Sequence, residues 1–332
     1  MRKIYLDNQS TTQLDPEIMD YMIPYFLKKF GNSSSKTHSY GWEAEAAVDL
    51  SRKHISDLIN SKPNEIIFTS GATESNNIAL ASILKSKKTN FITCLTEHRA
   101  ILDICKSYEN KGIKTKYLNI SNNGNLDLDN LENNLSENIH MISLMHANNE
   151  IGTIYPIEEI GAICKKHNIL FHVDAAQSLG KIPIDVKKMN VDFMSFSSHK
   201  IYGPKGIGAL FISNKYKNKI HPITFGGGQE NGLRPGTLPV PLIIGFGEAC
   251  KKANSVMLSE SKKIKKMRDT LLSNIKKEIP NLIINGTMEN RLHGNLNLSF
   301  PSLKGQSIVT SIPSVALSSG SACSSSISKP SH

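Results

Sequence analysis

The sequence predicts an α/β fold built around a mostly parallel sheet with helices packed on its faces. Short apolar stretches alternate along the chain with amphipathic stretches of roughly 10–15 residues, the pattern of strands joined by crossover helices. Polar residues follow several apolar stretches directly, and open α/β sheets bind their ligands at such strand ends. The alternation stops near Lys251, where a long lysine-rich stretch begins.

Hydrophobic periodicity and turn residues place the individual elements. The first helix is expected to begin at Asp15, because Pro16 suits the first position of a helix. Strands are expected over 65–69, 90–95, 114–118, 140–145, 169–173, 191–196 and 207–212. Further helices are expected over 41–60, 128–135 and 157–167, up to 84 and 108 after two of the strands, and from 251 onward.

The length of the chain favours two domains of unequal size. A chain of 332 residues exceeds the usual single domain, and 39% apolar residues are enough for a substantial core. We expect a large α/β domain over 14–250. The segments 1–13 and 251–332 are expected to form a smaller α+β domain with short strands over 282–284 and 295–299.

The net charge of +10 raises the question of a nucleic-acid partner. The lysines are scattered along the chain. The modest cluster of lysines within 251–266 has no aromatic residues between them, a pattern that indicates the solvated face of a helix. An acidic protein partner suits the excess charge better than nucleic acid does. No apolar stretch could span a bilayer, and the chain leaves no room for a signal or transit peptide, so we expect a cytoplasmic protein.

The five cysteines separate into two groups. They include no C-x-x-C pair and are too dispersed for a disulfide framework or a zinc site, so no metal is expected. Cys94, Cys105, Cys164 and Cys250 lie in apolar periodic stretches and are expected to fill the core. Cys323 lies in SSGSACSSSIS without apolar neighbours, which leaves a reactive thiol or a cysteine in a disordered tail.

The stretch VDFMSFSSHKIYGPKGIG holds the lysine with the clearest chemical signal. Lys200 follows a buried strand, and an amine desolvated by apolar neighbours has a lowered pKa. Such an amine forms Schiff bases with carbonyls, including that of pyridoxal phosphate. Taken alone, a Ser-His-Lys tripeptide such as this one favours a lysine in a solvated turn.

Three other strand ends change that interpretation. Ser-Gly-Ala-Thr over 70–73 could bind a phosphate at a helix N-terminus, although it could also be an ordinary capped helix start. Asp174 could pair with a protonated pyridine nitrogen or cap a helix, and His98 could stack on a ring or lie on the surface. A phosphate site, a histidine, an aspartate and Lys200 on successive strands together indicate a pyridoxal phosphate site.

Eight motifs in family order carry a resemblance to known enzymes. They are YLDNQSTT, TSGATESNN, TEHRAILD, MHANNEIGT, HVDAAQSLGK, SFSSHKIYGPKGIGAL, GGGQENGLRPGTLPV and SSGSACSS. With these motifs the chain resembles cysteine desulfurases of the NifS/IscS type, class V aminotransferases with the fold-type-I pyridoxal phosphate architecture. The resemblance implies a mixed, mostly parallel seven-stranded sheet and a smaller α+β domain.

The resemblance implies three catalytic residues. Lys200 would form the Schiff base with the cofactor, and His98 would stack on its ring and act as acid and base. Cys323 would be the nucleophile that takes the substrate sulfur as a persulfide. Asp174 would pair with the pyridinium nitrogen, and Gln177 would hydrogen-bond the ring hydroxyl.

The resemblance also implies further cofactor ligands and a homodimer. These ligands would be Ala72, Thr73, Ser197 and His199 at the phosphate, Asn148 near the ring hydroxyl and the substrate carboxylate, and Thr237 at the phosphate of the other subunit's cofactor. The implied reaction converts L-cysteine to L-alanine and a persulfide, for iron–sulfur cluster assembly or tRNA thiolation. A sulfur acceptor or scaffold protein would dock near the loop of Cys323.

Three departures from the family pattern leave other readings open. Pro235 stands where the family usually has serine, Ser33 replaces a usual proline, and the chain ends at His332 whereas the family continues with an arginine that clamps the substrate carboxylate. One alternative is a truncated, catalytically impaired homologue that acts as a binding partner. Another is a different fold-type-I enzyme, such as a selenocysteine lyase or an aminotransferase; transamination would not need Cys323.

Overall fold

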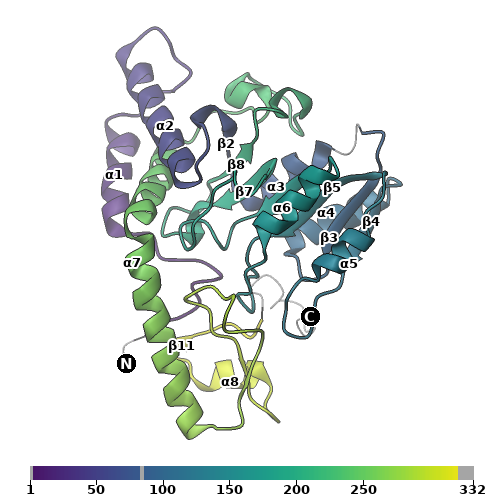
Figure 1. The fold of residues 1–332 in the computed structure, drawn as a ribbon. Coiled ribbons are helices and arrows are strands. Elements are labelled where there is room, and N and C mark those ends of the chain that lie inside the picture. The colour runs from purple at the N-terminus through teal and green to yellow at the C-terminus, as the bar shows by residue number, and fades with distance from the viewer. Residues whose placement is uncertain (1–2, 83–85, 321–332) are drawn as a thin grey trace.

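A computed structural model describes residues 3–82 and 86–320 of the chain. Within these residues, the main sheet has seven strands in the order β2-β8-β7-β6-β5-β3-β4 (Figure 1). The strands from β7 to β4 pair in parallel, whereas β8 is antiparallel to both β2 and β7. The strands are β2 (Ile66–Thr69), β3 (Asn90–Cys94), β4 (Lys114–Leu118), β5 (Ile139–Met145), β6 (Leu170–Asp174), β7 (Phe193–Ser197) and β8 (Gly208–Ile212). The predicted mixed, mostly parallel sheet is confirmed.

Helices cover both faces of this sheet, and neighbouring strand residues point to opposite faces. Met141 of β5 joins a core with α3 and α4, while the next residue, Ile142, joins the core with α2, α5, α6 and α7. Because both faces are covered, the inner strands are almost continuously buried, as parallel strands usually are. The helices are α1 (Pro16–Leu27), α2 (Ser39–Leu58), α3 (Ala72–Leu80), α4 (Arg99–Glu109), α5 (Leu128–Asn133), α6 (Ile157–Lys166), α7 (Val240–Glu278) and α8 (Gly305–Ser311).

Several predicted element ends are confirmed by their local chemistry. Asp15 caps α1, its carboxylate accepting the Glu17 N–H at 3.0 Å, with Pro16 in the first turn. The edge strand β4 has the predicted bounds, and its outward lysines, Lys114 and Lys116, protect the open edge from pairing with another chain.

The start of α7 corrects the prediction. The sequence places the beginning of this helix near residue 251, but α7 already begins at Val240. The missed part contains Gly245 and Gly247, which weaken a helical pattern in the sequence. A Cβ on Gly245 would lie 2.5 Å from a sulfur atom of α1, and one on Gly247 would lie 2.6 Å from a backbone atom of α2. These glycines therefore let helices pack closely instead of ending α7.

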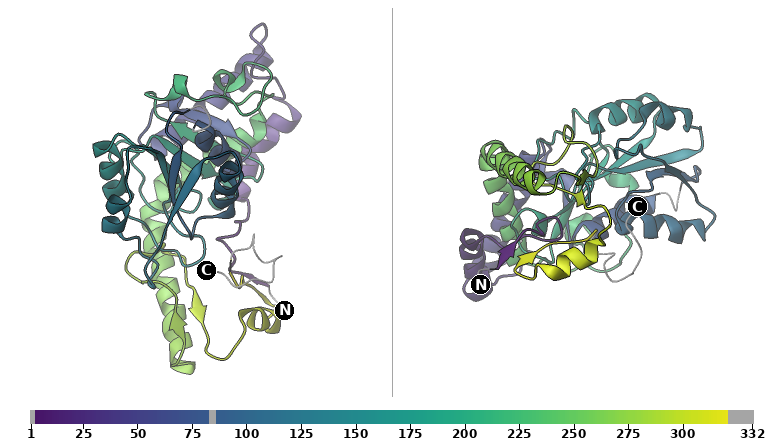
Figure 2. Two further views of the ribbon diagram at one scale, coloured as in Figure 1. Left: turned by 90° about the vertical axis from the view of Figure 1, so that its right-hand side faces the viewer. Right: turned by 90° about the horizontal axis from the view of Figure 1, so that it is seen from below.

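The helix α7 runs continuously from the layer beside the sheet to the two small sheets (Figure 2). In one of these, β1 (Ile4–Tyr5) pairs in parallel with β11 (Val315–Ala316). In the other, β9 (Ile283–Ile284) pairs antiparallel with β10 (Leu298–Ser299). The proposed domain boundary between residues 250 and 251 thus falls inside a single helix.

Two further predictions can be compared with the described part of the chain. Cys94, Cys105, Cys164 and Cys250 are all buried, as expected, whereas Cys323 lies outside the described residues. No helix within 3–82 and 86–320 combines the length and the apolar character needed to cross a membrane.

A buried ion pair holds the loop 225–237 against the sheet. The Glu230 carboxylate accepts two hydrogen bonds from the Arg52 guanidinium, at 2.7 and 2.9 Å, and one from the Phe68 N–H at 2.7 Å. Glu230 and Asn231 have φ values of 49° and 57°, which residues other than glycine seldom adopt. The ion pair therefore stabilises a loop conformation that the backbone alone disfavours.

We expect Glu230→Ala to lower the free energy of unfolding by about 3–5 kcal/mol, because it leaves the Arg52 guanidinium without its carboxylate and the Phe68 N–H without its acceptor. Urea unfolding followed by circular dichroism measures this. The matched control is Glu45→Ala, which breaks the exposed Lys36–Glu45 pair and should cost less than about 1 kcal/mol. Equal losses in the two variants would contradict the anchoring role of Glu230.

Candidate active site

The predicted site residues gather where β3, β5, β6 and β7 end. Asp174 is the last residue of β6, and Lys200 ends the 3-10 turn Ser198–Lys200 that follows β7. The N-terminal arm, residues 7–12, crosses this edge of the sheet. Its Thr12 N–H donates to His199 O at 2.9 Å. The arm was not predicted to be part of the site.

The side chain of Lys200 is half-buried and is held by the arm. Its Nζ donates hydrogen bonds to the backbone oxygens of Gln9, at 2.5 Å, and Ser10, at 2.8 Å. The Gln177 amide donates to the same Gln9 oxygen at 2.9 Å. One backbone carbonyl therefore brings together two residues that the sequence assigned to the cofactor.

Lys181 is a second lysine of the site, and the prediction missed it. Its Nζ donates to Gln177 Oε1 at 3.3 Å. Burial, with the nearby charge of Lys200, lowers the pKa of Lys181 to about 7. The sequence feature that could have identified Lys181 is its position at the end of the motif HVDAAQSLGK, four residues after Gln177.

Asp174 is buried, and both of its carboxylate oxygens accept hydrogen bonds. Oδ1 accepts from the Ala176 N–H at 3.0 Å, and Oδ2 accepts from Asn76 Nδ2 at 2.9 Å. Turns instead of a helix follow Asp174, so its carboxylate does not cap a helix. Asn76 was also missed, although it lies one turn after Ala72 on α3.

The N-terminus of α3 has the properties of an anion site. Its N-cap residue is Gly71, with φ 156°, so no side chain caps the first N–H groups of the helix. A Cβ on Gly208 would lie 2.6 Å from Gly71 Cα, so a glycine there is needed for the close approach of β8. Ser197 lies beside this turn, since its Oγ would be 3.8 Å from a Cβ on Gly71. Helix N–H groups that have no side-chain cap, together with a hydroxyl, suit a phosphate.

His199 lies next to Lys200 and is tied to the arm. Its Nδ1 is 3.0 Å from Thr11 Oγ1. Burial and the charges of nearby lysines, above all Lys200, lower the pKa of His199 to about 4. At neutral pH His199 is therefore an uncharged hydrogen-bonding group.

The other predicted residues have local partners or lie at the surface. The Nδ1 of His98 accepts from the Ala100 N–H at 3.1 Å and caps α4. Asn148 Oδ1 accepts from two N–H groups of its own turn, at 2.8 and 2.9 Å. The side chain of Thr73 and that of Thr237 are exposed. The loop of Thr237 is tied to α3, because Arg234 Nε donates to Glu74 Oε1 at 2.9 Å.

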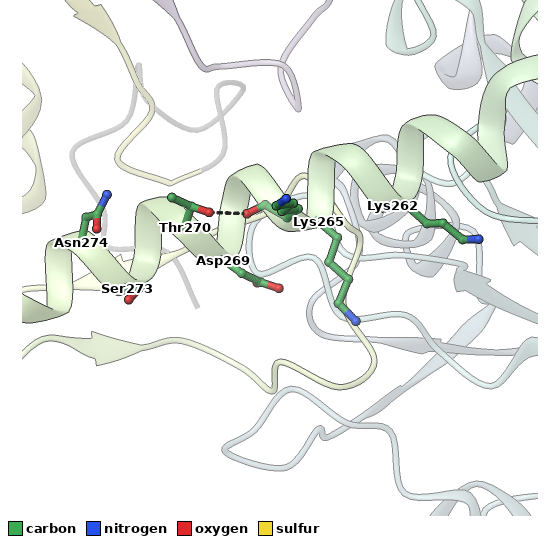
Figure 3. A pocket seen from close by; sticks show the side chains of 7 residues that line it. Lys262, Lys265, Asp269, Thr270, Ser273 and Asn274 are labelled. Carbon is green, nitrogen blue, oxygen red and sulfur yellow. Dashed lines mark hydrogen bonds between the residues drawn. The ribbon is translucent and has the colours of Figure 1, made fainter.

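An open hollow on α7 contains none of the predicted site residues (Figure 3). It is lined by Lys262, Lys265, Lys266, Asp269, Thr270, Ser273 and Asn274. These residues come from one face of one helix, and none of them is buried. The hollow therefore lacks the convergent, desolvated polar groups of an active site, which are found around Lys200.

Comparisons with known proteins give the family context. The family model "Aminotransferase class-V" matches residues 4–332. The cysteine desulfurase IscS of Ehrlichia chaffeensis is 49% identical over 99% of this chain and 81% of its own length, and that of Rickettsia felis has the same values. Among solved structures, a NifS-like protein has a TM-score of 0.89 at 37% identity, covering 94% of this chain and 85% of its own. A structure of SspA in complex with cysteine has a TM-score of 0.88 at 35% identity, covering 99% and 92%.

We expect the stability of the protein to rise between about pH 7 and pH 10.5 through Lys181. The folded state lowers the pKa of Lys181 to about 7, whereas in the unfolded chain it is near the ordinary value of 10.5. Between these two pKa values the Lys181 amine takes up a proton when the chain unfolds, so a higher pH favours the folded state. Urea midpoints at several pH values should show this rise in the wild type and less of it in Lys181→Met. The exposed control, Lys205→Met, should follow the wild type; equal slopes in all three proteins would refute the assignment.

Proposed function

The chain belongs to the aminotransferase class-V family, and from this premise we propose that it is a cysteine desulfurase, which removes sulfur from L-cysteine and releases L-alanine. The observation that carries the proposal is the Lys200 site within a chain 49% identical, over 99% of its length, to a curated cysteine desulfurase. The direct test is the release of L-alanine from L-cysteine by the purified protein.

The family depends in general on pyridoxal phosphate, and the residues of this site fit that cofactor. The uncapped N-terminus of α3 and the Ser197 hydroxyl suit its phosphate, and the buried Asp174 carboxylate suits a protonated pyridine nitrogen. The half-buried Lys200 amine suits its aldehyde. When bound, pyridoxal phosphate supplies an electron-withdrawing ring that stabilises negative charge on the α carbon of an amino acid.

The residues of the chain then have distinct tasks. Lys200 Nζ would hold the cofactor and, once released, move a proton at the substrate α carbon. Gln9 and Ser10 would orient Nζ through their carbonyls. The Asp174 carboxylate would bind the ring nitrogen in an orientation set by Asn76. Because these partners are fixed before the substrate binds, little reorganisation is required during the reaction.

His98 would act as acid and base through one particular nitrogen. Its Nδ1 already accepts the Ala100 N–H, so in the neutral ring the proton is on Nε2. The cap fixes the ring at the start of α4, and Nε2 is the atom that could exchange a proton with the substrate. Ala72, Thr73, Asn148, Gln177 and His199 remain proposed cofactor ligands.

Cys323 is the proposed sulfur acceptor, by its position in the motif SSGSACSS. Its thiolate would attack the substrate sulfur, forming an S–S bond while the C–S bond breaks. The electron pair of the C–S bond stays with the carbon fragment, which takes up a proton and leaves as alanine. Sulfur remains on Cys323 as a persulfide and passes to an acceptor or scaffold protein that docks near this residue, for iron–sulfur cluster assembly or tRNA thiolation.

We propose that the enzyme is a homodimer in which Thr237 reaches the cofactor phosphate of the other subunit. We also propose that it is a cytoplasmic protein with two domains, one over 14–250 and one formed by 1–13 and 251–332. The anchored loop 225–237, which presents Thr237 at the surface, supports the dimer. Alanine production from L-cysteine also separates this function from transamination and from an inactive binding partner.

Lys200→Ala should abolish the visible absorbance of the purified protein supplied with pyridoxal phosphate, because the variant has no amine at the site to bond the cofactor. Borohydride treatment of the wild type should attach the cofactor to the peptide containing Lys200. The matched control is Lys205→Ala, which removes an exposed lysine five residues away and should keep the absorbance. Borohydride labelling of another lysine would contradict the assignment.

Cys323→Ser should keep the visible absorbance and lose more than about 99% of alanine release, since the reaction lacks its sulfur acceptor. Brief iodoacetamide treatment near pH 8 should label Cys323 first in the wild type, because the other four thiols are buried and burial raises the pKa of Cys105 to about 12. Mass spectrometry of the digested protein identifies the labelled peptide. Cys105→Ala, the matched control, should retain turnover; earlier labelling of Cys94 or Cys105 would refute the assignment.

A further inference from the structure

The side chain of Gln9 offers an unused hydrogen-bond donor within the site. Its Nε2 atom is buried and has no hydrogen-bond partner among the described residues. A buried donor without an acceptor costs roughly 1–3 kcal/mol, so the binding of an acceptor there is favoured. The backbone oxygen of the same residue accepts from Lys200 Nζ and from Gln177 Nε2.

The orientation of the Gln9 amide is set by a chain of hydrogen bonds from Arg291. A guanidinium can only donate, so the bond of 2.8 Å from Arg291 Nη1 must go to Asn295 Oδ1. The Nδ2 of Asn295 then donates to Gln9 Oε1 at 2.5 Å and to Glu150 O at 2.9 Å. With Oε1 of Gln9 occupied, the group left for a ligand is its N–H donor.

This chain of hydrogen bonds is supported by packing against another part of the protein. The segment around Asn295 packs on the connection between β5 and α6, where the Leu292 N–H donates to Gly152 O at 2.9 Å. A Cβ on Gly152 would lie 2.4 Å from the Asn295 side chain, so only glycine allows this approach. Asn295 and Arg291 are both buried, which keeps the chain of hydrogen bonds away from water.

The charges around Gln9 favour an anion. The Lys200 amine lies on one side of it, donating to the Gln9 backbone oxygen. On the other side, the Arg291 guanidinium donates hydrogen bonds to neutral oxygens of Thr287, Asn295 and Asn285. The acceptor that best satisfies Gln9 Nε2 is therefore a negatively charged oxygen.

We propose that the side-chain amide of Gln9 binds the carboxylate of the amino-acid substrate and contributes to the enzyme's specificity for amino acids. This inference rests on the proposed function. The substrate amino group must reach the same cofactor atom as Lys200 Nζ, which lies 2.5 Å from Gln9 O. The carboxylate is attached to the carbon next to that amino group, so it comes within reach of the side chain of the same residue.

The experiment compares two ligands of the cofactor-loaded protein, L-alanine and ethylamine, by absorbance titration. They share an amino group and a methyl group, but only L-alanine has a carboxylate. In Gln9→Met, a variant of similar shape without a donor, the dissociation constant of L-alanine should rise roughly tenfold to a hundredfold. That of ethylamine should stay the same. The backbone carbonyl that holds Lys200 remains in this variant.

Two further variants make the test specific. Asn8→Met, the same kind of change at the neighbouring exposed residue, should leave both dissociation constants unchanged. Asn295→Asp can still accept from Arg291 but cannot donate to Gln9 Oε1, so the Gln9 amide should turn over and L-alanine should bind as weakly as to Gln9→Met. The double variant should add little to either change, because both act on the same donor.

An unchanged ratio of the two dissociation constants in Gln9→Met would overturn the proposal, as would weaker binding of both ligands by the same factor. If Gln9→Met does not fold, the Asn295→Asp variant decides by the same ratio. Failure of the proposed function is separate: a wild-type protein that binds no pyridoxal phosphate, or releases no alanine from L-cysteine, refutes the desulfurase and not the role of Gln9 alone.

Discussion

The site depends on one backbone carbonyl, that of Gln9, which accepts hydrogen bonds from Lys200 Nζ and Gln177 Nε2. A lysine at a strand end has many rotamers, and fixing one of them costs roughly 1.5–2 kcal/mol of side-chain entropy. The two short hydrogen bonds that Lys200 Nζ donates to carbonyls of the arm offset this cost. Because the oxygen belongs to the backbone, no side-chain substitution at residue 9 removes it. The position of Lys200 is therefore secured by the path of the chain itself.

That path is determined by contacts that are distant in sequence. Before the site, the arm pairs through β1 with β11, about 310 residues further on, and Ser318 donates to Asp7 Oδ1 at 2.7 Å. After the site, the Thr12 N–H donates to His199 O, and the Thr12 hydroxyl accepts from the Tyr202 N–H. The arm is thus held at both ends, and its middle has little freedom to leave Lys200. The small β1–β11 sheet thereby contributes to the geometry of the site although it contains none of the predicted cofactor ligands.

The sequence predicted the fold and the strand-end residues because both depend on residues that are close together in the sequence. Periodicity and a proline give the start of α1, and the buried stretch before Lys200 gives β7 and its end. The beginning of α7 was missed because glycines that permit close helix packing look the same in sequence as glycines that end a helix. Gln9, Asn76, Lys181 and Asn295 were missed because each acts through a partner, and all but Lys181 have that partner far along the chain. Cys323 remains a prediction outside the described residues.

In two pairs of like groups at the site, burial and the charged neighbour shift the pKa of one member toward its neutral form. Burial, together with the nearby Asp174, raises the pKa of Glu97 well above its ordinary value, and Glu97 accepts the Met145 N–H. Lys181 stands in the same relation to Lys200, since burial and that neighbour lower its pKa to about 7. Like charges close together in a buried place cannot both be kept without a large cost. Asp174, with two hydrogen-bond donors, and Lys200, with two carbonyls, are the better-solvated members of their pairs. The same two residues are those that the proposed chemistry requires, so the pKa shifts of their neighbours help to define which groups can act.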